Sequence, residues 1–135
     1  MTRFDASEPA ERRKLYVDAI TAHRERGSRF LTLEADDSVR DESGDSESLG
    51  TPWIQFGDGT INIDCTDAEL ETLKALLEDF PAFKIDDLTR PEEAEGTNVR
   101  ISAKADPNRI AQFIDEVFLE VYEFQSTVRV WLVDV

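Results

Sequence analysis

The segment TPWIQFGDGTINIDCT, residues 51–66, constrains the fold of this chain more tightly than any other stretch. Two alternating apolar runs flank an Asp-Gly dipeptide, which suits the positive φ values of a two-residue type I′ turn. This turn pairs Phe56 with Ile61. Further from the turn it pairs Ile54 with Ile63, so all four side chains share one face. A shift of one residue would turn that face to solvent, so the sequence predicts a hairpin of fixed register with one buried face.

Three segments have the apolar spacing and end signals of amphipathic helices. The first covers residues 8–26, where Ser7 is expected to cap the start and Gly27 to end the helix. The second covers residues 66–80. The third covers residues 106–124 and has an apolar face so broad that it is expected to lie deep in the domain or under a partner.

Local signals fix the starts of the second and third helices. Thr66 and Glu69 form the pattern of a capping box, in which each residue satisfies a backbone N–H of the other. Asp106 is expected to cap the third helix, with Pro107 at its first position, where a missing N–H costs little.

Strands are predicted on both sides of these helices. The last one, VRVWLVDV, is apolar on both sides apart from Arg129, so both of its faces are expected to be covered, with Trp131 in the core. The resulting order is α-β-β-β-α-β-β-α-β, which predicts one α+β domain, with a mainly antiparallel sheet and helices packed on one face. Outside the hairpin, the predicted strands are 28–35, 83–89, 97–105 and 128–135. The domain is expected to span residues 1–135, with an acidic, mobile loop over 36–48.

The net charge is the strongest compositional signal. Asp and Glu number 30 against 15 Lys and Arg, a net charge of −15. Such a chain repels itself at low ionic strength, whereas molar salt shortens the Debye length to about 3 Å. In its acidity and its low lysine content, the chain resembles small haloarchaeal proteins of unassigned function. This resemblance implies a salt-rich cytoplasm and weakly associated monovalent cations. The alternative is an acidic protein that recruits a basic partner or mimics nucleic acid.

The acids are densest in EADDSVRDESGDSES, residues 34–48, which hold seven acids and one arginine. A calcium loop of the EF-hand type needs oxygen ligands at alternate positions, a glycine, and a glutamate six positions later. Here Gly50 stands where the glutamate would be, and no helix flanks the loop. A solvated connector is therefore the interpretation we adopt.

The sequence offers little for catalysis or metal binding. The chain has one cysteine, Cys65, which alternates with the apolar residues of the hairpin and is expected to be a core thiol. Its one histidine, His23, lies on the apolar arc of the first helix and is expected to be packed. Paired carboxylates such as Asp115 and Glu116 are expected by chance among 30 acids. We therefore expect no catalytic, cofactor-binding or metal-binding residues.

The first eight elements resemble the order of the type III secretion chaperone-like fold, and NVRISAKADPNRIAQFIDEVFLEVYEF is similar in pattern to its last strand and helix. This resemblance implies a dimeric, non-enzymatic protein that binds other polypeptides. The extra strand over 128–135 departs from the pattern and puts the usual dimer mode in doubt.

The favoured hypothesis is a non-enzymatic, cytoplasmic protein that acts through protein–protein contact as a homodimer or with another partner. The first rival is a small-molecule or anion site, or an enzyme, that uses the arginines of the first helix. The second is a nucleic-acid-associated regulator, which the repulsion between a −15 chain and phosphates disfavours. No membrane partner is expected. The candidate contact residues are Trp53, Arg12, Arg13, Arg24 and Arg26.

Overall fold

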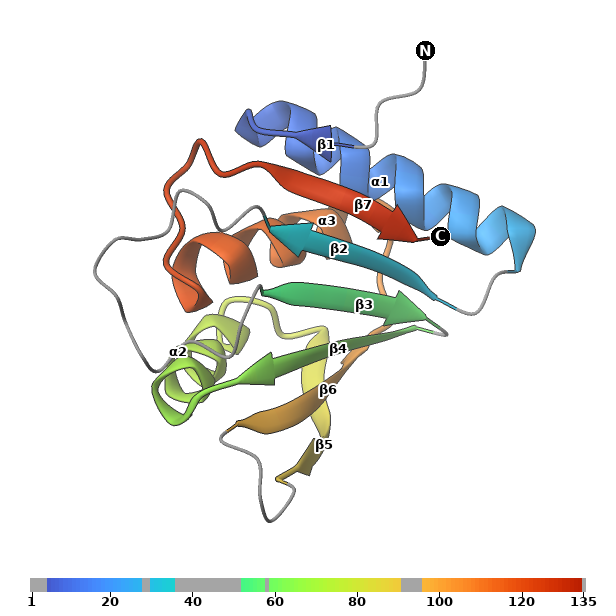
Figure 1. The fold of residues 1–135 in the computed structure, drawn as a ribbon. Helices are drawn as coiled ribbons and strands as arrows, with labels where there is room; N and C mark the ends of the chain where they lie inside the picture. Colours follow the sequence, from blue (N-terminus) through green and yellow to red (C-terminus); the bar gives the residue numbers. More distant parts are fainter. Residues whose placement is uncertain (1–4, 28–29, 36–51, 58, 91–95, 135) are drawn as a thin grey trace.

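The computed structural model describes residues 5–27, 30–35, 52–57, 59–90 and 96–134. Within these residues, seven strands form one sheet in the order β1-β7-β2-β3-β4-β6-β5, and all neighbouring strands are antiparallel (Figure 1). The strands are β1 (Asp5–Ala6), β2 (Leu31–Ala35), β3 (Trp53–Gly57), β4 (Thr60–Cys65), β5 (Phe83–Thr89), β6 (Thr97–Ala103) and β7 (Val130–Asp134).

The helices are α1 (Pro9–Arg26), α2 (Asp67–Leu77) and α3 (Pro107–Glu116), and α3 continues into a π-helical segment, η2 (Val117–Val121). The predicted α+β class is confirmed, and so is the expected order of elements. The structure adds β1, a strand too short to carry a sequence signal, and shows a π-helical segment at the end of the third helix.

The hairpin has the predicted register. Phe56 lies opposite Ile61, and the paired residues next to the turn are Gly57 and Thr60. Gly59 has φ +72, a value that glycine adopts without steric cost. The first turn residue lies outside the described residues, as does the acidic segment 36–48.

The ends of the helices follow their local chemistry, with one difference. The capping box of α2 is present, because Thr66 N donates to Glu69 at 2.8 Å and Glu69 N donates to the Thr66 hydroxyl at 3.2 Å. The α1 helix ends as predicted at Gly27, with φ 64. Its cap residue is Glu8 rather than the predicted Ser7, and the Glu8 side chain makes no capping hydrogen bond. The proline after Glu8 explains the shift, because it fixes the first helical position.

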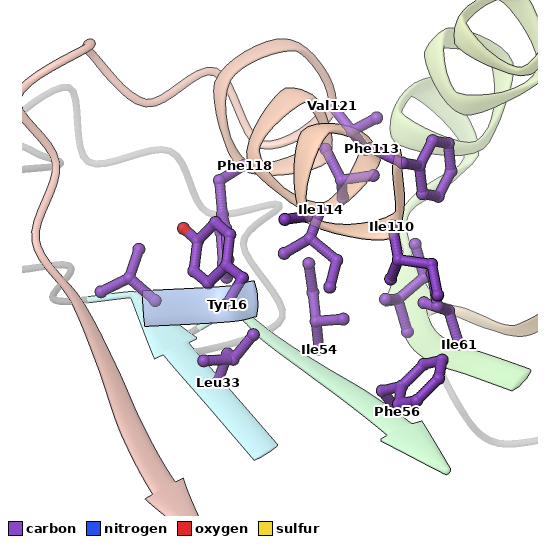
Figure 2. Packing of buried hydrophobic residues seen from close by; sticks show 14 of the residues in the cluster. Tyr16, Leu33, Ile54, Phe56, Ile61, Ile110, Phe113, Ile114, Phe118 and Val121 are labelled. Carbon is purple, nitrogen blue, oxygen red and sulfur yellow. The ribbon is translucent and has the colours of Figure 1, made fainter. Parts of the chain in front are cut away.

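One face of the sheet forms the core. Leu33, Ile54 and Ile61 point from the strands toward α1 and α3 in Figure 2, and all three are completely buried. From the helix side, Tyr16 and Phe118 meet them, also with no exposed surface. The apolar side chains alternate along each strand, so the polar side chains between them lie on the opposite face.

The broad apolar face of the third helix is covered by the chain itself. Ile110, Phe113 and Ile114 have no exposed surface, and neither do Val117 and Phe118 in η2. Of the two expected positions of this helix, deep in the domain or under a partner, the structure shows the first. The reason is that three neighbours, α1, α2 and the sheet, surround α3 and η2.

The tail strand β7 corrects a second expectation. It does not lie between two covered faces, because Trp131 is 42% exposed and Val133 is 51% exposed. Val130, on the other face, is completely buried. The helices pack on one side of β7 only, so its second apolar face remains open. In the part of the chain that the structure describes, no helix is long and apolar enough to span a membrane.

Candidate functional site: the open face of the sheet

The face of the sheet that the helices leave uncovered carries exposed apolar side chains at one end. We call it the open face, and its strands at this end are β7, β2 and β3. Trp131 and Val133 extend from β7, and Phe30, 46% exposed, lies immediately before β2. These are three of the four exposed large apolar residues among those the structure describes. A solvent-facing sheet surface is normally polar, so this concentration marks a candidate contact surface.

Two tryptophans flank a glutamate on the open face. Strand pairing places Glu34 of β2 opposite Trp53 of β3 and opposite Trp131 of β7. The neighbours of Glu34 along β2, Leu33 and Ala35, are buried, so Glu34 points to the open face. Directly opposed side chains in such pairs have Cβ atoms about 5 Å apart. We call Trp131, Glu34 and Trp53 the Trp-Glu-Trp row.

The Glu34 carboxylate makes no hydrogen bond or ion pair with the residues that the structure describes. A cation on the open face lies immediately before the start of β7. There Arg129 is ion-paired with Asp5 of β1, which lies opposite Trp131. Arg129 is therefore neutralised by Asp5, whereas no cation among the described residues neutralises the carboxylate at the centre of the row.

A polar recess of about 420 Å³ adjoins this end of the open face. Its lining includes Phe30, Gln55, Asn62 and Arg100. The Asn62 side-chain oxygen is enclosed without a hydrogen-bond partner. The Arg100 guanidinium also has no hydrogen bond or ion pair within the described residues. The enclosed Asn62 oxygen is out of reach of a partner, so the recess offers a partner only the Arg100 cation.

The helix layer carries a second hollow, a groove of about 680 Å³ between α1 and α3. Arg13 and Lys14 line it from α1, and Glu116 lines it from α3. Burial raises the pKa of the Glu116 carboxyl, and the nearby charge of Glu120 raises it further. Lys14 is ion-paired with Asp18 at 3.0 Å, on the exposed surface.

A buried charged cluster lies beneath this groove. The Arg12 Nε donates to the Asp115 carboxylate at 2.7 Å, and the Tyr16 hydroxyl donates to the same oxygen at 3.2 Å. Arg12 also donates to the carbonyls of Ser126 at 2.6 Å and Val128 at 3.0 Å. Burial raises the pKa of Tyr16 well above its ordinary value, and the Asp115 charge adds to the effect. The Arg12 side chain is buried, and all three of its guanidinium nitrogens donate hydrogen bonds. The cluster therefore connects α1, α3 and the segment before β7, and it presents no reactive group.

Comparison with known families gives one result. The profile described as a family of unknown function, DUF7975, matches residues 1–135. The chain belongs to the DUF7975 family. No curated protein and no solved structure matches it.

In this DUF7975 protein, the five candidate contact residues do not form one site. Trp53 is half-buried in the Trp-Glu-Trp row, on the open face. The four arginines belong to α1, on the other side of the sheet. Arg13 lines the α1/α3 groove, and Arg26 is exposed at the end of α1.

Arg24 and Arg12 are used within the chain. Arg24 donates to the Ala105 carbonyl at 3.1 Å, and its guanidinium lies 5.9 Å from the centre of the Phe56 ring. Arg12 has no exposed surface with which to contact a partner, so its place among the contact residues is corrected. Its burial depends on Asp115, which is 103 positions away in the sequence. No local sequence pattern could predict that pairing.

The two residues expected to be packed are confirmed as such. Cys65 is completely buried, and burial raises the pKa of its thiol to about 12. His23 is 6% exposed and its ring meets Phe56 edge-on at 5.5 Å. Burial lowers the His23 pKa, with a further contribution from Arg24. Among the residues that the structure describes, no cluster of His, Cys, Asp or Glu could hold a metal ion.

Sequence reasoning missed Glu34 and Trp131 as members of a site. The sequence of this DUF7975 chain contains part of the information needed to find them. Alternation along SRFLTLEA places Glu34 away from the core, yet its neighbours depend on which strands flank β2. β7 inserts beside β2 from the far end of the chain, and that pairing is non-local.

Proposed function

We propose that this DUF7975 protein is non-catalytic and works by binding another polypeptide on the open face of its sheet. The observation that carries the proposal is the exposure of Trp131 and Val133, 42% and 51%, beside the half-buried Trp53. Large aromatic side chains supply most of the binding energy of protein contacts when a partner removes them from water. The helix layer on the other face holds these strands rigid, so little ordering entropy opposes binding.

The partner we favour is a different polypeptide with a surplus of basic residues. Two copies of a chain with a net charge of −15 bring like charges together at the contact, whereas a basic partner brings opposite charges to it. Self-association through the same face is the competing possibility, and molar salt would weaken the repulsion that opposes it. We place the protein in a salt-rich cytoplasm, on the basis of its acidity, with weakly associated monovalent cations on its carboxylates.

The proposal is tested by photo-crosslinking in the native host. A photoreactive amino acid replaces Val133 on the open face of the full chain, and in a control chain it replaces Glu25, which is exposed on α1. A partner crosslinked from position 133 but not from position 25 is identified, purified and titrated against the unmodified protein by calorimetry.

The double variant Trp131→Ser and Val133→Ser is then compared with Val17→Ser in the α1/α3 groove. We expect the open-face variant to lose at least about tenfold in affinity, the loss of a typical aromatic contact residue, and the groove variant to bind normally. Equal affinity of the open-face variant and the unmodified protein would overturn the proposal. Crosslinks between copies of this chain alone would identify the second copy as the occupant and overturn the basic partner.

A second candidate function rests on the α1/α3 groove, whose volume of about 680 Å³ is in the range of small-molecule sites. Arg13 and Lys14 could hold an anion there. Only one of the candidate arginines, Arg13, lines the groove, and His23 does not line it, so the groove gathers few of the groups that an anion site or an enzyme would use. Loss of the crosslinked partner on changing Arg13 to Glu, with no effect of the open-face variant, would favour the groove.

A further inference from the structure

We propose that the Trp-Glu-Trp row binds a lysine or arginine side chain of the partner polypeptide. This inference rests on the proposed function and names the chemistry by which the open face selects its partner. Three observations support it: the register of three strands, the charge of the chain, and the lack of any hydrogen bond or ion pair between Glu34 and the other described residues.

The geometry brings two aromatic rings to one carboxylate. Glu34 is opposite Trp131 on one side and Trp53 on the other, and all three side chains leave the same face of the sheet. A cation held over the glutamate can therefore contact both indoles. Tryptophan is the best of the aromatic residues at attracting a cation to its ring face, and aromatic rings around a carboxylate are suited to ammonium and guanidinium groups.

Desolvation explains why the site demands a cation. A partner that covers Trp131 and Val133 also removes water from Glu34, which lies between the two tryptophans. A buried carboxylate without a counter-charge is costly, so a purely apolar partner would lose much of what it gains from the tryptophans. Within the described residues no cation pairs with Glu34, and the nearby Arg129 is held by Asp5. The partner must therefore supply the positive charge.

The flanking rings also make the contact suited to high salt. Exposed ion pairs are screened when the Debye length falls to about 3 Å in molar salt. A pair enclosed between two indoles excludes mobile ions and is screened less. The long-range attraction due to the net charge is lost in molar salt, but the contact at the row is retained.

The chain provides its own reporter for this site. Its two tryptophans, Trp53 and Trp131, are both members of the row, so indole fluorescence reports on the row alone. The full protein is titrated with the synthetic peptide acetyl-Ser-Thr-Val-Lys-Val-Thr-Ser-amide, in low salt and in molar KCl. Matched peptides carry Arg or Gln in place of the central Lys.

We expect the Lys and Arg peptides to change the indole emission saturably at both salt concentrations, and the Gln peptide to bind at least about tenfold more weakly. Glu34→Gln should weaken Lys-peptide binding by a similar factor. Glu25→Gln makes the same change in net charge on α1 and should leave binding unchanged. Trp131→Phe retains an aromatic ring and should bind better than Trp131→Leu.

Four outcomes overturn the inference. Equal binding of the Lys and Gln peptides would show that the face binds polypeptides without reading charge, and the proposed function would stand without this inference. Equal weakening of Lys-peptide binding by Glu34→Gln and Glu25→Gln would show that binding depends on the net charge of the protein and not on the position of Glu34. Emission that changes on dilution of the protein alone would show a second copy on the row. If no peptide binds, the cation site is overturned, and the crosslinking experiment decides the proposed function separately.

Discussion

Arg12 and Asp115 form a fully buried ion pair between α1 and α3, with the Arg12 Nε 2.7 Å from the Asp115 carboxylate. The two residues are 103 positions apart, and Arg12 also bonds the carbonyls of Ser126 and Val128 just before β7. One side chain thus fixes the position of the first helix, the third helix and the start of the strand that carries Trp131.

Removal of one partner should leave the other charge buried and unpaired. We expect Arg12→Met to lower the free energy of unfolding by about 3–5 kcal/mol, measured by urea denaturation in molar KCl. Arg12→Lys retains the charge but not the forked geometry, so its loss should be smaller. The matched control is Arg13→Met on the exposed side of α1, which should stay within about 0.5 kcal/mol of the unmodified protein. Similar losses for Arg12→Met and Arg13→Met would contradict the structural role of the pair.

The Cys65 thiol should be inert in the folded protein. Burial raises its pKa to about 12, so almost no thiolate exists at neutral pH, and the thiolate is the reactive form. An aromatic disulfide reagent should therefore label Cys65 only after urea unfolding. Rapid labelling of the folded protein at neutral pH would show that the hairpin is not packed as described.

Glu116 should destabilise the folded protein at neutral pH. Its pKa in the folded state is raised by burial and by Glu120, four residues later, so the folded state disfavours the charged form. The raised pKa means that the cost is present above the folded pKa and vanishes as pH falls below 4.5, the ordinary value. We expect Glu116→Gln to stabilise the protein at pH 7 by about 0.3 kcal/mol, the size of a like-charge pair at this spacing.

The measurement is the free energy of unfolding of both proteins across this pH range. The difference between them should shrink toward zero in acid, because both side chains are then neutral. A stabilisation that grows as pH falls would have the opposite sign from the one that the raised pKa predicts.

Salt should stabilise the whole protein. With a net charge of −15, self-repulsion opposes the compact state, and molar salt screens it. We expect the melting temperature to rise steadily between low and molar KCl. The same melting temperature throughout would refute the proposal of a salt-rich environment.

The parts of the fold that depend on neighbouring residues could be predicted from the sequence. The register of Phe56 with Ile61, the capping box at Thr66 and the end of α1 at Gly27 each rest on a few adjacent residues.

The predictions that were wrong concern features that depend on residues far apart in the sequence. Whether Trp131 faces the core or solvent is decided by the insertion of β7 between β1 and β2, and by the helices covering one face only. Arginine side chains usually lie on the surface, yet Arg12 is buried because it forms an ion pair with Asp115. The Trp-Glu-Trp row combines three strands, one of them near the end of the chain, so no single segment contains it.

The central claim, that the open face rather than the α1/α3 groove is the contact surface, is tested most directly by NMR. The nitrogen-15-labelled protein is titrated with the Lys-centred peptide in molar KCl. We predict that the indole N–H signals of Trp53 and Trp131 and the backbone amides of β7 and β2 shift together, while those of Arg13 and Glu116 stay in place. Shifts along α1 and α3 with both indole signals unmoved would contradict the account.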